Sequence, residues 1–159
     1  MILDEERLRT IGETIGRRIV GPVFFALRGE LGAGKSVFAR AVARGAGVVG
    51  TLPSPTFNLR FDYPLPEGRR LVHMDLYRIQ RADDVWELGW EELGEPGEIA
   101  LVEWPERAER YLPADRWEVV LTPVPDEPNR REVRLVRHGG SAPLPFIPGL
   151  AASFPDAGS

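Results

Sequence analysis

The sequence predicts an α/β fold in which helices flank a mixed, mainly parallel sheet that also contains an antiparallel hairpin. Two short apolar runs, residues 23–27 and 99–102, have the unbroken hydrophobicity of strands that are buried on both faces, as in parallel sheets. Segments expected to be helical surround the first run. Residues 57–63 alternate between apolar and polar, and a turn at 64–68 separates them from a second expected strand at 70–76, which indicates a hairpin.

The first half of the chain is expected to begin with a helix from residue 4 to residue 20. Acidic residues occupy its first turn, Gly21-Pro22 ends it, and apolar residues recur at helical spacing at Leu8, Ile11, Ile15 and Ile19. Gly12 and Gly16 lower its helix propensity. The strand at 23–27 follows, and then a glycine-rich turn at 29–34, a helix at 35–46 and a loop at 47–55.

The second half is expected to continue after the hairpin with one or two short helices within residues 82–93. The buried strand at 99–102 and a helix opened by Pro105 come next, and two late strands at 117–121 and 132–136 follow. Residues 139–159 are rich in proline and glycine and show no periodicity. We therefore expect one domain over residues 1–138 and a loosely held tail over 139–159.

The composition excludes several classes of function. A chain of 159 residues usually forms one domain, and the absence of cysteine excludes disulfides, zinc-thiolate sites and thiol nucleophiles. The net charge of -4 argues against a dedicated nucleic-acid-binding protein. No apolar run approaches the roughly 18 residues of a membrane span, and the acidic residues 4–6 are unlike a secretory signal. We expect a cytoplasmic protein with no membrane partner.

The strongest motif is a phosphate-binding loop. Residues 29–36 match the pattern G-x-x-x-x-G-K-[ST] and lie between an expected strand and an expected helix, which is the context that this motif requires. Lys35 is expected to reach the β- and γ-phosphates of a nucleotide, and Ser36 to ligate Mg²⁺. The candidate nucleotide-binding residues of this segment are Gly29, Glu30, Leu31, Gly32, Ala33, Gly34, Lys35, Ser36 and Val37.

Lys35 is also the only lysine in the chain. Lysine and arginine together number 20, and every other one of these is arginine. Lysine carries a compact ammonium on a thin stem, whereas arginine carries a planar fork. Because every other cationic position holds arginine, we expect that the site around Lys35 does not admit the arginine fork. Val37 follows Ser36 where many such loops have Thr or Ser, so only its backbone N–H can reach the α-phosphate.

A phosphate loop also needs an acidic residue at the end of a neighbouring buried strand. Asp75 and Glu103 each end an apolar run, and the run before Glu103 is the clearer buried strand. His73 is expected to be packed and hydrogen-bonded rather than catalytic. Thr56 lies where a switch loop would approach Mg²⁺ or the γ-phosphate; the alternative is a turn shaped by Pro55, in which Ser54 and Thr56 act as local caps.

Missing motifs narrow the class of phosphate-loop protein. The guanine-reading motif Asn-Lys-x-Asp needs a second lysine, so GTPases of that type are excluded, and the Leu-Ser-Gly-Gly-Gln segment of transport ATPases is absent. Hexameric ATPases need a longer chain. A small kinase remains open, and its mobile lid would have to come from Arg78 with Arg81 or from Arg107 with Arg110.

Four segments together resemble the TsaE family in identity, order and spacing. They are Gly29 to Ser36, Ser54 to Thr56, His73 to Arg78 and Leu101 to Pro105, and the resemblance extends roughly over residues 4–136. TsaE proteins are small bacterial ATPases of tRNA threonylcarbamoyladenosine biosynthesis. The resemblance implies a phosphate-loop fold and a Mg²⁺-dependent ATPase, weak alone, that binds ATP and ADP and assists TsaB and TsaD. It implies contact with tRNA only through these partners.

The resemblance also assigns roles to residues. It makes Ser36 and Glu103 the metal ligands, Asp75 a second acid near the metal and the attacking water, and Lys35 the phosphate-binding cation. Thr56 fits a switch contact, and Trp104 an aromatic side chain beside the nucleotide. The alternative is a regulatory module that switches partners on nucleotide binding with little hydrolysis.

One basic stripe remains, formed by Arg130, Arg131, Arg134 and Arg137. On a strand, Arg130 and Arg134 share one face with Glu132, while Arg131 and Arg137 point to the other face. The stripe is therefore split, and we interpret it as a solvated or partner-facing strand edge. We expect no tight binding of tRNA by this chain alone.

Overall fold

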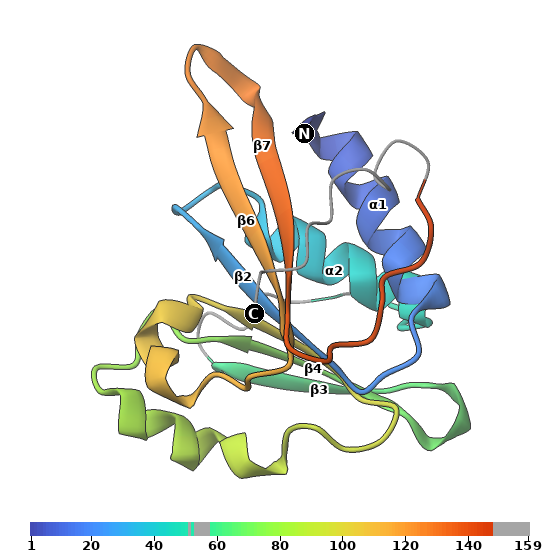
Figure 1. Ribbon diagram of the computed structural model, residues 1–159, viewed down its shortest axis with the longest axis vertical. Helices are drawn as coiled ribbons and strands as arrows, with labels where there is room; N and C mark the ends of the chain where they lie inside the picture. Colours follow the sequence, from blue (N-terminus) through green and yellow to red (C-terminus); the bar gives the residue numbers. More distant parts are fainter. Residues whose placement is uncertain (51, 53–57, 148–159) are drawn as a thin grey trace.

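A single seven-stranded sheet organises the chain in the computed structural model, which describes residues 1–50, 52 and 58–147. The strands lie in the order β1-β7-β6-β2-β5-β4-β3 (Figure 1). Their bounds are β1 (Ile2–Asp4), β2 (Val23–Gly29), β3 (Arg60–Pro64), β4 (Arg70–Asp75), β5 (Ile99–Glu103), β6 (Arg116–Val124) and β7 (Glu127–His138).

The centre of the sheet is parallel and its margins are antiparallel. β2 pairs in parallel with both β5 and β6, and β4 pairs in parallel with β5. The predicted hairpin is confirmed by the antiparallel pairing of β3 with β4. Since Leu27 and Asp75 both pair with Glu103, the carboxyl ends of β2, β4 and β5 meet at one edge.

The two α-helices begin and end where local sequence signals indicate. In α1 (Glu5–Arg18), the Asp4 side chain accepts a hydrogen bond from the Arg7 backbone N–H at 2.7 Å and so caps the first turn. Glutamates then occupy the first turn and arginines the last, which complements the helix dipole. α2 (Lys35–Ala46) begins directly after the glycine-rich turn, as predicted.

The expected short helices are present as 3₁₀ helices. Residues 82–93 form two of them, and Pro105 opens another, as predicted, which ends at Tyr111. A one-turn 3₁₀ helix also lies between β3 and β4. Their bounds are η1 (Pro66–Gly68), η2 (Ala82–Leu88), η3 (Trp90–Glu92) and η4 (Pro105–Tyr111).

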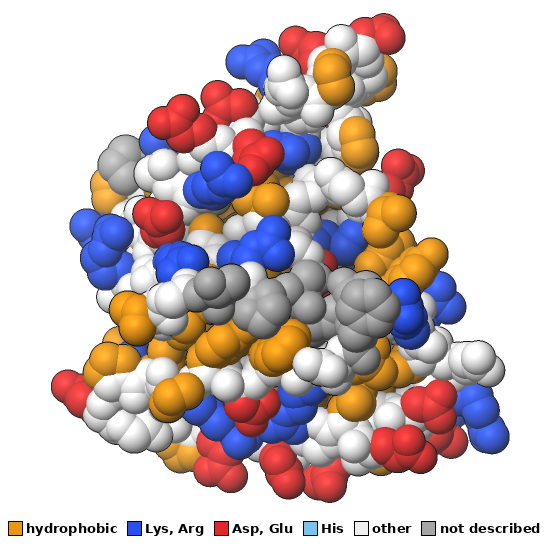
Figure 2. Space-filling model, turned by 180° about the vertical axis from the view of Figure 1, so that it is seen from behind, with side chains coloured by type: hydrophobic (Ala, Val, Ile, Leu, Met, Phe, Trp, Pro, Cys, Tyr) orange, Lys and Arg blue, Asp and Glu red, His pale blue; other side chains and the backbone are white. Residues whose placement is uncertain are grey.

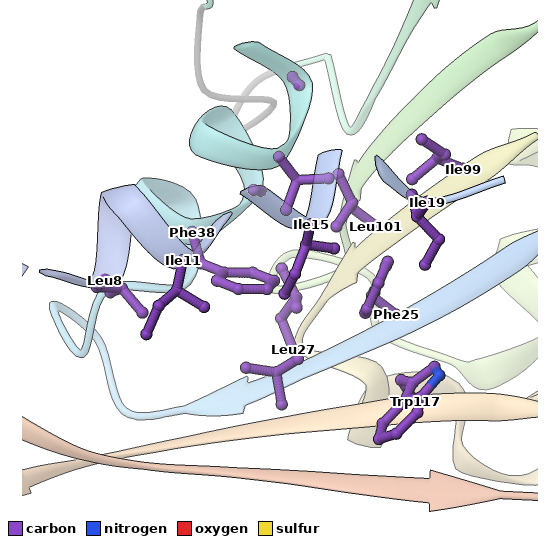
Figure 3. Packing of buried hydrophobic residues seen from close by; sticks show 14 of the residues in the cluster. Leu8, Ile11, Ile15, Ile19, Phe25, Leu27, Phe38, Ile99, Leu101 and Trp117 are labelled. Carbon is purple, nitrogen blue, oxygen red and sulfur yellow. The ribbon is translucent and has the colours of Figure 1, made fainter. Parts of the chain in front are cut away.

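Two hydrophobic clusters cover the two faces of the sheet, so the molecule has three layers. Phe25 and Leu27 of β2 face the cluster that includes the apolar sides of α1 and α2. Figure 3 shows Phe38 of α2 pointing between α1 and β2. Phe24 and Ala26 alternate to the opposite face, where they pack with residues of η2, η3 and η4. β2 is therefore buried on both faces, as its unbroken apolar sequence predicts.

Glycines on α1 and α2 allow the two helices to pack closely where they cross. A Cβ on Gly16 would lie 2.0 Å from the Val42 carbonyl oxygen, and one on Gly45 of α2 would lie 2.0 Å from the Glu13 carbonyl oxygen. No side chain fits at such distances. The low helix propensity of Gly16 is thus a requirement of tertiary packing, which the spacing of apolar residues within α1 does not reveal.

Two parts of the chain depart from expectation. Residues 2–4 form the strand β1, which pairs with β7, whereas we expected the helix to begin at residue 4. The tail was expected to be loosely held from residue 139, and this is wrong for residues 139–147. Ile147 is buried in the core, and Trp117 Nε1 donates a hydrogen bond to the Ala142 carbonyl oxygen at 2.8 Å. Within the described residues, no helix has both the length and the apolar composition of a membrane span.

The helix crossing can be tested with Gly45→Ala. In an isolated helix this change would stabilise by about 1 kcal/mol, but here the added methyl meets the α1 backbone and should cost about 1–3 kcal/mol. The free energy of unfolding in urea measures the difference. Gly140→Ala is the matched control, because its nearest neighbouring atom would be 3.7 Å away. A Gly45→Ala variant more stable than the wild type would contradict the packing described here.

Candidate functional site

The turn between β2 and α2 has the backbone shape of an anion-binding loop. Gly32 and Gly34 adopt positive φ angles of 81° and 111°, a region that side chains disfavour. The Ala33 N–H donates to the Glu30 carbonyl and closes the turn, while the Phe38 N–H bonds back to the Gly34 carbonyl as α2 begins. The first N–H groups of a helix lack intrahelical partners and carry partial positive charge. Such a helix end binds anions.

Lys35 is held at the mouth of this turn. Its side chain is buried, and Nζ donates hydrogen bonds to the carbonyl oxygens of Gly29 at 2.6 Å and Glu30 at 2.8 Å. The ammonium also lies 4.2 Å from the centre of the Trp104 ring. Burial lowers the pKa of Lys35 from its ordinary value, and the nearby carboxylates, Glu103 foremost, offset part of this effect. Two carbonyls and an indole enclose a space that suits a compact ammonium better than a fork.

Trp104 itself has a strained backbone. Its φ of 58° places a large non-glycine residue in the left-handed region directly after β5. The ring also packs against Tyr77, with ring centres 4.9 Å apart. Trp104 thus lies beside the phosphate loop and lines the same cavity as Lys35.

Glu103 joins α2 to the ends of β4 and β5. Its side chain is 2% exposed, and Oε1 accepts a hydrogen bond from the Ser36 hydroxyl at 2.8 Å. His73 Nε2 lies 2.6 Å from Oε2 and donates to it, because a carboxylate can only accept. His73 is packed and hydrogen-bonded, as expected. Its bond fixes the orientation of the acid that faces Ser36.

Asp75 lies beside Glu103 in the sheet register but in a different environment. Its Oδ1 accepts the backbone N–H of Tyr77 at 2.9 Å. Burial raises the pKa of Asp75, and the charge of Glu103 adds to the rise, while the Tyr77 N–H, His73 and Lys35 act in the opposite direction. A carboxyl group with a raised pKa is a better proton acceptor than an ordinary aspartate.

These groups share a cavity of about 230 Å³. Gly29 and Glu30 contribute their carbonyl groups to Lys35, and the Ala33 side chain is buried in the core. Thr56 lies outside the described residues. A larger cavity of about 380 Å³ contains none of the motif residues. The motif cavity is lined by Glu5, Leu31, Gly32, Gly34, Lys35, Ser36, Val37, Asp75, Glu103, Trp104 and Arg131.

Arg131 was missed as a site residue. We interpreted its stripe as a solvated or partner-facing edge, and this is wrong for Arg131, because β1 pairs with β7 and covers that edge. Arg131 is only 8% exposed and lines the cavity, whereas Arg130 and Arg134 are exposed on the other face, as the alternation predicted. The alternation of side chains along the strand could have indicated this position, because Arg131 lies on the same inward face as the apolar residues Val133 and Leu135.

The oxygen atoms at the site fit a magnesium ion with few protein ligands. The Ser36 hydroxyl and the Glu103 carboxylate converge beside the phosphate loop. Within the described residues there is no group of three or more metal-binding side chains. Mg²⁺ commonly takes one or two carboxylates and completes its shell with phosphates and water, rather than using an all-protein cage. The two residues predicted as metal ligands therefore form a donor set that is compatible with a nucleotide-bound Mg²⁺.

Comparisons with known proteins agree on one family. The family model for threonylcarbamoyl adenosine biosynthesis protein TsaE matches residues 2–133. Relatives described as tRNA threonylcarbamoyladenosine biosynthesis protein TsaE include one from Aquifex aeolicus, 36% identical over 135 residues, which cover 84% of this chain and 91% of the relative. One from Bacillus subtilis is 35% identical over 116 residues, or 71% of this chain and 68% of the relative. The crystal structure of Bacillus subtilis YdiB superposes with a TM-score of 0.62 at 26% identity, covering 84% of this chain and 80% of that chain.

The bond between His73 and Glu103 can be tested by stability. His73→Phe removes the donor but retains an aromatic ring, and leaves one side of a buried carboxylate without a partner. This should lower the free energy of unfolding by about 1–3 kcal/mol. His73→Gln, whose amide nitrogen can donate near the same place, should recover part of the loss.

The chain's other histidine supplies the control for this test. His138 lies at the looser distance of 3.7 Å from Glu118 and is partly exposed, so His138→Phe should change stability by less than about 1 kcal/mol. Equal losses for His73→Phe and His138→Phe in urea unfolding would show that the buried bond contributes nothing specific.

Proposed function

This chain belongs to the TsaE family, and from that premise we propose that it binds and hydrolyses ATP as a component of the tRNA threonylcarbamoyladenosine machinery. The observation that carries the proposal is the convergence of Lys35, Ser36 and Glu103 at the phosphate loop. A cationic turn and a metal-binding oxygen pair lie together there, and this is the arrangement that phosphoryl transfer to water requires.

Each residue has a role that follows from its contacts. The N–H groups at the amino end of α2 and the Lys35 ammonium bind the phosphates. Ser36 and Glu103 would hold Mg²⁺, and the cation would supply positive charge to neutralise the phosphates. His73 keeps Glu103 oriented toward Ser36. The Trp104 ring covers Lys35 and excludes water from it.

We assign Asp75 to the attacking water. Its Oδ1 is engaged by the Tyr77 N–H, so Oδ2 is the atom that accepts the proton from water. The raised pKa of Asp75 favours this transfer. Glu103, which is engaged by Ser36 and His73, is less suited to accept a proton and better suited to hold the metal.

The proposed partners are TsaB and TsaD, in the cytoplasm. The relatives are named for tRNA threonylcarbamoyladenosine biosynthesis, which supports a role beside other proteins of that pathway. The acidic net charge of this chain argues that it reaches tRNA through such partners. On the face shown in Figure 2, acidic and basic side chains are interspersed. Backbone-driven binding of nucleic acid needs clustered cations, so this face is poorly suited to it.

Separate substitutions distinguish the two acids. Glu103→Gln should lower ATP hydrolysis and raise the Mg²⁺ concentration that half-maximal activity requires, because a neutral amide binds the cation weakly. Asp75→Asn should slow hydrolysis by about 10²–10⁴-fold while changing nucleotide affinity little. Steady-state rates across a Mg²⁺ series, together with calorimetric binding of ADP, measure both effects.

Glu106→Gln is the control for these two variants, because Glu106 is an acidic residue near Lys35 that does not line the cavity. Its rate and metal dependence should stay close to those of the wild type. If Glu103→Gln kept the wild-type Mg²⁺ dependence, the metal role would pass to Asp75.

The function itself is tested by ATP turnover with and without the TsaB–TsaD pair. We expect slow hydrolysis by the isolated chain, faster hydrolysis with the pair, and capture of the pair that differs between ATP and ADP. Binding of ATP without turnover in either condition would favour the regulatory switch over the ATPase. Submicromolar binding of tRNA by the isolated chain that resists salt would contradict indirect contact with tRNA.

A further inference from the structure

Arg131 is a buried cation that none of the roles assigned above uses. We propose that Arg131 is a nucleotide ligand supplied by β7, which donates to the α-phosphate of bound ATP or ADP. This inference rests on the proposed nucleotide-binding function and adds a residue to that site.

The first support is that Arg131 is buried without being satisfied. Its side-chain atoms Nε and Nη1 are inaccessible and have no hydrogen-bond partner among the described residues. No carboxylate in the described part of the chain forms an ion pair with it. Burial of a charged group without partners is costly, and replacement by an apolar side chain of similar size is often neutral or stabilising. The presence of arginine here is therefore not explained by the stability of the fold and suggests a role in binding a ligand.

The second support is where the side chain lies. Arg131 lines the cavity of the phosphate loop together with Lys35, Ser36 and Val37. A Cβ placed on Gly34 would lie 3.7 Å from Arg131 Nε and 3.8 Å from Cζ, so the guanidinium packs against the backbone just before α2 begins. Unpaired N–H donors thus adjoin the anion-binding turn. Arginine is the side chain whose planar fork best matches phosphate oxygens.

The sheet order indicates which phosphate Arg131 contacts. The phosphate loop follows β2, and Glu103 comes from β5 on one side of it. Arg131 comes from β7, on the other side of β2 beyond β6. Ser36 and Glu103 would hold Mg²⁺ on the β5 side of the phosphate loop, whereas Arg131 approaches the loop from the opposite side, so we assign Arg131 to the α-phosphate. Val37 offers no hydroxyl there, and Arg131 supplies the side-chain donor that this position lacks.

The test compares Arg131→Met and Arg131→Lys with the wild type. Calorimetry with Mg²⁺ measures the affinity for ADP and for ATP, and urea unfolding measures the stability of the nucleotide-free protein. Arg131→Met should weaken both nucleotides by the same factor, about 10- to 100-fold, as expected for loss of a charge-assisted contact. The nucleotide-free variant should be at least as stable as the wild type. Arg131→Lys should lie between the two in affinity.

Arg134→Met is the matched control, since Arg134 is on the same strand but exposed on the opposite face. Its affinity should equal that of the wild type. Unchanged binding in Arg131→Met overturns the proposal, and so does a stability loss with unchanged binding, which would indicate a structural role. A loss for ATP alone would place the guanidinium on the γ-phosphate and overturn the α-phosphate assignment. A wild-type protein that binds neither nucleotide would overturn the proposed function together with this inference.

Discussion

The parallel pairing of β2 with β5 is the constraint on which the site depends. It sets Leu27, two residues before the phosphate loop, beside Glu103, and this allows Ser36 at the start of α2 to bond that carboxylate. Pairing of β4 with β5 then brings His73 and Asp75 to the same edge. Several charged groups are buried there as a consequence, and burial disfavours their charged forms, as the shifted pKa values of Lys35 and Asp75 indicate. Short hydrogen bonds offset this cost for Lys35 and Glu103, whereas Nε and Nη1 of Arg131 lack such bonds among the described residues.

Local patterns were sufficient to predict most of the fold and several of the residues that lie around the phosphate loop. The helix at 35–46 and the buried strands β2 and β5 were predicted because each carries its signal within its own residues: a phosphate-loop motif, helical spacing or an unbroken apolar run. Glu103 and Asp75 could be predicted because parallel strands bring their carboxyl ends to one edge. The solitary Lys35 was informative because its surroundings suit an ammonium rather than a guanidinium.

What the sequence did not reveal depends on contacts between distant segments. The three residues of β1 are too few to show a periodicity, and they become a strand only by pairing with β7. Gly16 and Gly45 lower helix propensity locally, and their value is apparent only where α1 crosses α2. The alternation of side chains along β7 correctly predicts that Arg131 and Arg134 lie on opposite faces. It does not predict that the face of Arg131 lies beside the phosphate loop. The start of the tail was also not predicted, because Ile147 is buried by residues that are far away in the sequence.

The central claim is that a phosphate-binding site is built around a lysine that arginine cannot replace. Calorimetric titration of ATP with Mg²⁺ into the wild type and into Lys35→Arg tests it most directly, with urea unfolding to show that the variant is folded. The account predicts binding by the wild type and a loss of about tenfold or more in Lys35→Arg, equivalent to about 1.4 kcal/mol. Equal affinity in a folded Lys35→Arg variant would contradict the claim that the space between the loop carbonyls and Trp104 selects an ammonium.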